Sequence, residues 1–410
     1  MAAVAGRSVE QLAGIPHLSD EALFWTLLGV MAAAPMLTDR PPDTDAYSSQ
    51  AQSPSDIPSI TASRIGIPVL WVAAAMVLAS VVLGFTLVRN TNYALAESRA
   101  TSASKYLAGG QPENALQSID SAIALTPDVV RYHVIRANVL EQARKSTPEI
   151  SKQARLALGA YRSTSQAVDV NPYDIYGRLH HAEAALTLAA LGQPGKDEEA
   201  VAEYQRLTFM VPRLWLAHFL LGRAYIDTGQ PALAVEAYSE AIELDPNYEI
   251  IYDSRAEGYS ILGEHSLVVD DYDKAVELSP SDPSRYLLRG VSLFILGRLD
   301  EAIEDFDEAI ELYEKTIATL STSRKSPEEA ASFAPSLAMA YNNRGSTYQE
   351  AGQTGRAVSD YTSAIRINPL MGEAFFNRAT AFALLGRNAE AKKDLDQAES
   401  LGSVIPAQTP

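Results

Sequence analysis

Histidines are the side chains of this chain best suited to metal binding or proton transfer near neutral pH, and there are six of them. Only His180 and His181 are adjacent, and adjacent residues on a helix point about 100° apart, so this pair is poorly placed to share a metal ion. The chain has no cysteine, which excludes disulfides and thiolate chemistry. Neither a phosphate-binding glycine loop nor a supportable arrangement of serine, histidine and aspartate occurs. We therefore expect no catalytic residue, no metal and no cofactor.

The charged side chains are mostly carboxylates, and the formal net charge is -18. Non-specific nucleic-acid binding relies on basic groups that release counterions, so this class of partner is excluded. Carboxylate runs such as Asp270-Asp271-Tyr272-Asp273 lie where amphipathic helices are expected. We interpret them as solvated helix faces, and we expect no small-molecule substrate.

The elements that position these side chains form a repeated helical hairpin, clearest in residues 215–248. Gly222 and Tyr225 share one face of a first helix, and Ala234 and Tyr238 share one face of a second. Small residues let the two helix backbones approach closely, while the tyrosines fill the space around them. A Gly-Gln-Pro turn joins the helices, and an Asp-Pro-Asn stretch stops the second because proline lacks an amide hydrogen.

This order of leucine-glycine, tyrosine, alanine, aromatic residue and proline resembles a tetratricopeptide repeat, a unit of about 34 residues. The resemblance implies an all-α fold: a right-handed α-solenoid of helix-turn-helix repeats, each packed on its neighbours. Eight copies fit the sequence. We expect three irregular repeats in residues 96–214, three regular repeats in residues 215–316, an insert at residues 317–337 and two C-terminal repeats in residues 338–406.

An apolar stretch precedes the repeats. Residues 65–88 contain no charge and are flanked by Arg64 and Arg89; as a helix they would extend about 36 Å, enough to cross a membrane. We predict a transmembrane helix there. Within the N-terminal region, residues 1–64, a shorter apolar stretch at residues 22–37 is a possible second membrane segment, and the Pro-, Ser- and Thr-rich residues 38–64 predict a flexible linker.

The basic residues near the span bear on its orientation. Arg89, Arg99 and Lys105 follow it closely, whereas only Arg64 precedes it within twenty residues. Because loops rich in lysine and arginine tend to stay on the cytoplasmic side, we predict a single-pass, or two-pass, membrane protein with cytoplasmic repeats.

Paired residues emerge when the repeats are compared with one another. Four repeats carry an arginine on the first helix and an aspartate sixteen residues later on the second. These pairs are Arg255 with Asp271, Arg289 with Asp305, Arg344 with Asp360, and Arg378 with Asp394. We expect structural ion pairs worth about 0 to 1 kcal/mol each. His181 and Glu203 hold the equivalent positions of an irregular repeat, and we expect them to pair too.

The resemblance also implies where a partner binds, namely a concave groove lined by the first helices. The groove positions in the regular and C-terminal repeats include Leu216, Phe219, Arg223, Ile226, Asp227, Asp253, Glu257, Leu287, Phe294, Asn342, Ser346 and Gln349. An extended or helical segment of a protein partner with apolar anchors fits this lining. The groove positions carry no lysine, which disfavours a clamp for a peptide's C-terminal carboxylate. Whether some of the apolar residues instead pack on neighbouring repeats stays open.

Together these features predict a membrane-anchored scaffold that binds protein partners through its groove and is not an enzyme. A second interpretation rests on the layout of the first ninety residues. An apolar segment with Leu23-Phe24-Trp25, a linker, a span and then repeats resembles the C-terminal part of bacterial O-antigen ligase or polymerase proteins. The chain would then be a repeat subunit or fragment that acts in polysaccharide assembly.

Overall fold

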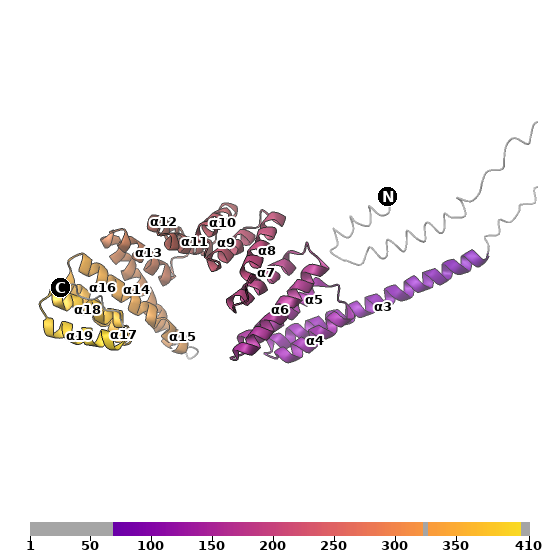
Figure 1. The fold of residues 1–410 in the computed structure, drawn as a ribbon, viewed down its shortest axis with the longest axis horizontal. Coiled ribbons are helices and arrows are strands. Elements are labelled where there is room, and N and C mark those ends of the chain that lie inside the picture. The colour runs from indigo at the N-terminus through magenta and orange to yellow at the C-terminus, as the bar shows by residue number, and fades with distance from the viewer. Residues whose placement is uncertain (1–68, 323–326, 403–410) are drawn as a thin grey trace, which may run out of the picture. The chain divides into compact units, whose positions relative to one another are not determined.

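The computed structural model describes residues 69–322 and 327–402, and every regular element in them is an α-helix (Figure 1). The predicted segments at residues 22–37 and 38–64, and the first four residues of the predicted span, lie outside these ranges. The helices are α3 (Val69–Ala108), α4 (Pro112–Leu125), α5 (Val130–Lys145), α6 (Ile150–Val170), α7 (Ile175–Ala190), α8 (Lys196–Met210), α9 (Trp215–Asp227), α10 (Pro231–Leu244), α11 (Glu249–Leu262), α12 (His265–Leu278), α13 (Pro283–Ile295), α14 (Leu299–Thr322), α15 (Pro327–Ser332), α16 (Ala334–Glu350), α17 (Thr354–Ile367), α18 (Gly372–Leu384) and α19 (Asn388–Ser400).

Each regular repeat is a hairpin of two antiparallel helices, and α9 with α10 shows why the sequence folds this way. Gly229 adopts a φ of 71°, which suits glycine in the turn, and Pro231 starts α10 where no amide hydrogen is needed. Gly222 lies directly against the ring of Tyr238. A Cβ atom added at Gly222 would stand only 2.5 Å from a ring carbon, so the close contact requires glycine. The small residue and the tyrosine are therefore one packing feature.

The described residues fall into two compact units, which divide between Val139 and Leu140, within α5. In the first unit, Ala96, Ala100 and Ala103 of α3 are buried in one cluster with Ile119 of α4. The apolar segment and the first helix of the first repeat are thus a single helix of 40 residues. The predicted span at residues 65–88 and the start of the first irregular repeat at residue 96 thus share this helix as far as the structure describes them. The helix continues because no glycine or proline lies between Val88 and Ala96 to stop it.

Within the described residues, α3 is the one helix long and apolar enough to cross a membrane. The stretch from Ala73 onward has a mean hydropathy of 1.7, and none of its most apolar window is buried. Met76, Val77 and Phe85 are each more than 60% exposed. A large exposed apolar surface is usually buried against another protein or in lipid, and a bilayer would bury this one.

In the second unit, the hairpins from α7 to α19 stack in chain order as an α-solenoid, each second helix packing on the first helix of the next repeat. The insert takes the form of a longer α14, the short α15 and an earlier start of α16. Tyr313 lies where α14 extends beyond the length of the other second helices, and it is 2% exposed. Its ring centroid lies 6.2 Å from that of Phe333. The insert therefore packs on the solenoid without interrupting it, since α14 still contacts α16.

Candidate functional site

The predicted groove residues lie on the first helices α9, α11, α13 and α16 of the second unit. We call the surface of α7, α9, α11, α13, α16 and α18 that carries the groove positions the first-helix face. Three predicted groove residues, Phe219, Leu287 and Asn342, are buried there. The remaining nine are exposed or half-exposed. Their role in binding stays a prediction.

The three buried residues hold neighbouring elements together. The Phe219 ring lies 5.8 Å from that of Tyr238 on the second helix of the same repeat. The Asn342 side chain accepts a hydrogen bond from Asn377 at 3.1 Å and donates one to Glu373 at 3.2 Å, which ties α16 to α18. Packing within and between repeats thus uses part of the predicted lining.

Asp253 is already neutralised by the next repeat. The Arg285 guanidinium, whose side chain is 7% exposed, donates to both Asp253 carboxylate oxygens at 2.9 to 3.1 Å. Arg285 also donates to the backbone carbonyl of Ser279 at 2.8 Å. Sequence reasoning missed this arginine, because it stands outside the groove positions and occurs in only one repeat. A signal was present nonetheless, since it is a cation one repeat after a groove carboxylate.

Arg223, Asp227 and Glu257 are exposed, and no hydrogen bond or ion pair joins them to any other described residue. Buried tyrosines on the second helices lie beneath these exposed charges. Tyr204, which is 1% exposed, lies close enough to Glu183, Arg223 and Asp227 to feel their charges, and burial raises the pKa of its hydroxyl. That hydroxyl is therefore a neutral donor at physiological pH, and it makes no hydrogen bond to a described residue.

The four arginine and aspartate pairs have one geometry. In each pair, two guanidinium nitrogens donate to the two carboxylate oxygens at 2.6 to 2.9 Å. A third nitrogen of each arginine donates to the preceding repeat; these acceptors are Ser239, Asp273, Asp307 and Thr362, at 2.5 to 3.1 Å. Each arginine therefore links the helices of its own repeat and the neighbouring repeat. The sequence comparison missed this second link.

The pair of Arg289 and Asp305 illustrates the electrostatics. The hydrogen bonds that Arg289 donates to Asp305 raise the pKa of Arg289, so the guanidinium stays charged. Burial raises the pKa of Asp305 although Arg289 donates to it. The carboxylate therefore depends on its arginine, and removal of the arginine would leave a poorly solvated charge.

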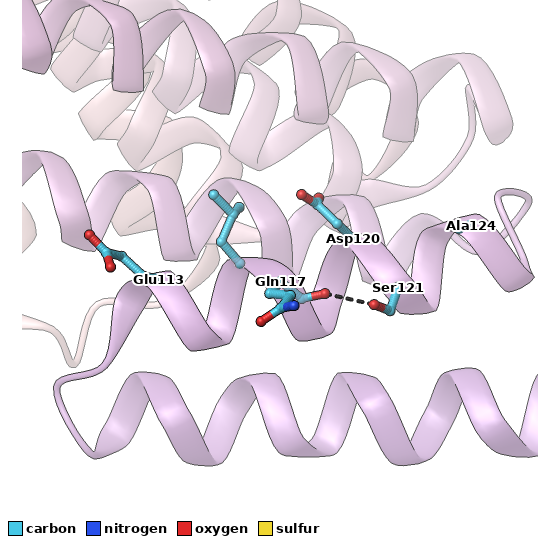
Figure 2. Close-up of a pocket in the computed structure, with 6 residues that line it drawn as sticks. Glu113, Gln117, Asp120, Ser121 and Ala124 are labelled. Atoms are coloured by element: carbon cyan, nitrogen blue, oxygen red, sulfur yellow. Dashed lines mark hydrogen bonds between the residues drawn. The ribbon is translucent and has the colours of Figure 1, made fainter.

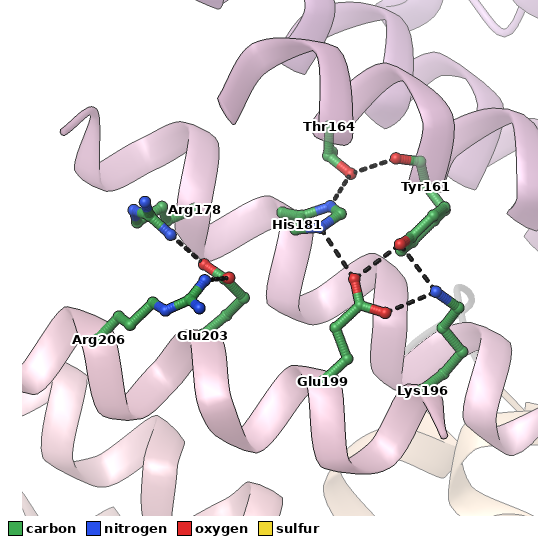
Figure 3. A network of polar contacts seen from close by, with 8 residues as sticks. All are labelled: Tyr161, Thr164, Arg178, His181, Lys196, Glu199, Glu203 and Arg206. Atoms are coloured by element: carbon green, nitrogen blue, oxygen red, sulfur yellow. Dashed lines mark hydrogen bonds and ion pairs between the residues drawn. The ribbon is translucent and has the colours of Figure 1, made fainter. Parts of the chain in front are cut away.

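The expected pairing of His181 with Glu203 is wrong. His181 Nδ1 lies 3.1 Å from Thr164 Oγ1, and its Nε2 lies 3.2 Å from Glu199, one turn earlier on α8 (Figure 3). Glu203 instead pairs with Arg178 and Arg206. Because Arg178 and Arg206 both bind Glu203, the shorter His181 side chain contacts the neighbouring carboxylate of Glu199 instead. Burial lowers the pKa of His181. The neighbouring carboxylates of Glu199 and Glu203 have the opposite, smaller effect on this pKa.

A second candidate site is an open pocket on α4 of the first unit, shown in Figure 2. It is lined by Glu113, Leu116, Gln117, Asp120, Ser121 and Ala124. Ser121 donates to the Gln117 carbonyl at 2.8 Å, and Asp120 accepts from Arg136 at 2.6 Å. The Ser121 and Asp120 side chains are thus bonded within their own unit. Across residues 69–322 and 327–402, no three histidine, aspartate or glutamate side chains are grouped as metal ligands.

Residues 215–248 and 283–316 match one tetratricopeptide repeat model, and residues 342–403 match another. These parts of the chain are therefore similar to tetratricopeptide repeats.

Two curated relatives are both tetratricopeptide repeat protein 36. The protein from Xenopus tropicalis is 32% identical over 84 residues, 20% of this chain and 42% of the relative. The protein from Danio rerio is 36% identical over 84 residues, 20% of this chain and 45% of the relative. The chain thus spans less than half the length of the curated relatives it matches.

Among solved structures, the chain is similar to YrrB, described as a TPR protein with an unusual peptide-binding site. The two are 20% identical, the match covers 52% of this chain and 96% of YrrB, and the TM-score is 0.41. A tetratricopeptide repeat protein from Parabacteroides merdae is 16% identical, with 74% of this chain and 98% of that protein covered and a TM-score of 0.43.

Proposed function

We propose that this protein is a membrane-anchored scaffold that binds a protein partner through the first-helix face and catalyses no reaction itself. Tetratricopeptide repeats typically serve as protein-interaction scaffolds, which agrees with the repeats matched here. One observation carries the proposal for this chain. Arg223, Asp227 and Glu257 project from three turns of the first-helix face without a partner in the described residues, although many other charges of this unit are paired.

The anchor in this proposal is the N-terminal part of α3. Its exposed apolar surface supports a membrane span, and α3 leads into the first repeat without a break. Arg89 lies at the end of the apolar stretch and pairs with Asp128 at 3.5 Å, so the first repeat starts where the bilayer would end. We further propose, from the basic residues that follow the span, that the repeats are cytoplasmic.

A photo-cross-linking experiment tests partner binding. The photoreactive residue p-benzoylphenylalanine replaces Arg223 on the first-helix face or, as a matched control, Glu240 on the exposed side of α10. We expect a discrete cross-linked product, identified by mass spectrometry, from position 223 and none of the same identity from position 240. Equal cross-linking from the two positions would contradict a role for the first-helix face.

Membrane anchoring is tested separately on the full chain. We expect the protein to remain in the membrane fraction after alkaline extraction, and we expect the repeats of a right-side-out spheroplast to resist added protease. Release by alkali would refute the span, whereas digestion of the repeats from outside would refute only the cytoplasmic location. The interpretation as part of an O-antigen ligase or polymerase rests on residues 1–90, which the structure describes only from Val69 onward, and it stays a prediction.

A further inference from the structure

Three exposed aromatic side chains lie at one end of the hairpin formed by α7 and α8. Phe209, near the end of α8, is 89% exposed, and Tyr173 and Tyr176, around the start of α7, are 81% and 71% exposed. The two helices pack as an antiparallel pair, so the start of α7 and the end of α8 share this end of the hairpin. Leu214, in the connection from α8 to α9, is 38% exposed and adds to the same surface. Exposed apolar side chains gathered in this way usually mark a surface that binds protein or lipid.

Both connections at this end of the hairpin are held by local contacts. Arg178 donates to the Pro172 carbonyl at 2.6 Å and also binds Glu203, which ties the connection before α7 to α8. In the connection from α8 to α9, His218 Nε2 lies 3.1 Å from the Pro212 carbonyl oxygen. The exposed apolar side chains therefore project from ordered backbone.

The charge of this part of the chain differs from that of the rest. Residues 204–226 contain no aspartate or glutamate, and only residues 57–96, which include the apolar segment, form a longer stretch of this kind. The chain as a whole has a net charge of -18. The Arg213 side chain, in the connection from α8 to α9, is exposed and makes no hydrogen bond or ion pair with a described residue.

We call the exposed residues at this end of the hairpin the aromatic edge. They are Tyr173, Tyr176, Phe209, Arg213 and Leu214. The exposed carboxylate of Asp169, at the end of α6, precedes them in the chain. The aromatic edge thus combines apolar rings, an aliphatic side chain and a cation without a partner in the described residues.

The first unit indicates what covers an edge of this kind. There the connection from α4 to α5 joins a second helix to the next first helix, and its Asp128 pairs with Arg89 at 3.5 Å. Arg89 ends the apolar stretch of α3, so this connection lies level with the surface of a bilayer that α3 crosses. The connections of the aromatic edge also join a second helix to the next first helix, and they hold the same place within their own repeats.

The chemistry of the aromatic edge fits the interface between membrane and water. Tyrosine is enriched there because its ring is apolar and its hydroxyl polar, and arginine forms paired hydrogen bonds with phosphate. Phe209 and Leu214 supply apolar surface for the lipid. Because residues 204–226 lack carboxylates, nothing in this stretch repels a lipid phosphate.

We propose that the aromatic edge contacts the bilayer interface, with Phe209 and Leu214 between the lipid headgroups. The rings of Tyr173 and Tyr176 lie beside them, and the Arg213 guanidinium binds a lipid phosphate. This inference rests on the proposed membrane anchor and adds a second contact with the same membrane. Two contacts limit how the second unit can turn, and therefore which side of the first-helix face is open to a partner.

The test uses nitroxide labels on the full chain in phosphatidylcholine nanodiscs. The chain has no native cysteine, so Tyr173→Cys, Ile261→Cys and Val81→Cys each carry one label. Ile261, 58% exposed near the end of α11, is the matched control, because it lies at the opposite end of its hairpin. Power saturation compares collisions of each nitroxide with oxygen, which concentrates in lipid, and with a water-soluble nickel complex. We expect a several-fold higher ratio of oxygen to nickel collisions at position 173 than at position 261.

Two double variants of the Tyr173→Cys protein test the apolar contact. Phe209→Ser with Leu214→Ser should lower the collision ratio at position 173 to that found at position 261. Ile261→Ser with Leu262→Ser also replaces two exposed apolar residues and should leave the ratio unchanged. Equal effects of the two double variants would overturn the inference.

A charge variant tests the contact with phosphate. Arg213→Glu should lower the collision ratio at position 173, because a carboxylate repels the lipid phosphates. Lys393→Glu makes the same change in charge at an exposed position of α19 and should have no effect. An unchanged ratio in Arg213→Glu would refute the contact between Arg213 and phosphate.

The label at position 81 separates this inference from the anchor on which it rests. A lipid-like ratio at position 81 with a water-like ratio at position 173 would overturn the inference and leave the anchor standing. Water-like ratios at both positions would refute both. A label at position 173 that neither oxygen nor nickel reaches would indicate contact with a second copy of the protein, which would also overturn the inference.

Discussion

Arg344 donates to Asp307 at 2.5 Å, although the insert lies between them in the chain. The equivalent arginine one repeat earlier, Arg289, donates to Asp273, sixteen residues before it. Both acceptors hold the same position of the second helix, so the link from repeat to repeat crosses the insert intact. The insert therefore changes the length of the helices beside it and preserves the stacking of the repeats.

The first prediction concerns Asp360. Replacement of Asp360 by lysine places a second cation against Arg344, whose guanidinium is mostly buried, and should lower the free energy of unfolding by about 3 kcal/mol or more. Asp360→Lys combined with Arg344→Glu reverses the pair and should recover part of the loss. Thermal denaturation followed by circular dichroism measures both effects. A harmless single variant would show that the pair does not matter for stability.

The second prediction concerns close packing between helices. Gly222→Ala places a methyl group 2.5 Å from the Tyr238 ring, which must move, and should cost about 1 to 3 kcal/mol of stability. Gly355→Ala is the matched control, because nothing lies within 4 Å of its new Cβ atom and α17 should gain about 0.5 kcal/mol. Urea denaturation compares the two. Equal effects would refute the close approach of Gly222 and Tyr238.

The third prediction is a pH dependence that originates at His181. Because burial lowers the pKa of His181 below 6.5, the unfolded chain binds a proton there more readily than the folded chain. Stability from this residue is therefore fully present above pH 6.5 and falls as the pH drops below it, by at most about 1.4 kcal/mol per pH unit. Glu199 and Glu203 oppose this lowering of the His181 pKa, and Lys196 adds to it.

Urea denaturation between about pH 5.5 and pH 7.5 measures this slope. His181→Gln should flatten it, whereas His218→Gln, a half-exposed position on α9, should leave it unchanged. An unaltered slope in His181→Gln would assign the pH dependence to other groups.

Much of this architecture is predictable because its signals are local. Gly222, Tyr238 and the turn at Gly229 lie within one repeat, and the same spacing recurs along the chain. The partner of His181 was not predictable. Glu199 and Glu203 lie one turn apart, and which of them remains available to His181 depends on which one binds the arginines. The link from Arg285 to Asp253 likewise depends on how two repeats stack. Position within the repeat places a residue on a face, but contacts between repeats decide whether it is available to a partner.

The last prediction concerns the continuity of α3. If the apolar segment and the first repeat form one helix, spin labels at Val81→Cys and Ser102→Cys should lie about 32 Å apart along the axis, at 1.5 Å per residue, in a narrow distribution. The chain has no native cysteine, so these two labels are unique. Double electron–electron resonance in nanodiscs measures the distance.

Thr91→Pro should broaden this distribution, because proline removes the amide that bonds to the carbonyl four residues earlier and clashes with it, at a cost of about 3 kcal/mol. Thr91→Ala, the matched control, should keep it narrow. Ala96, Ala100 and Ala103 pack on α4 beyond the kink, so the thermal midpoint of the repeats should change little in either variant. A broad distribution before any proline is introduced would show that the span and the repeats move independently, and the anchor would then fix the location of the first repeat without fixing its orientation.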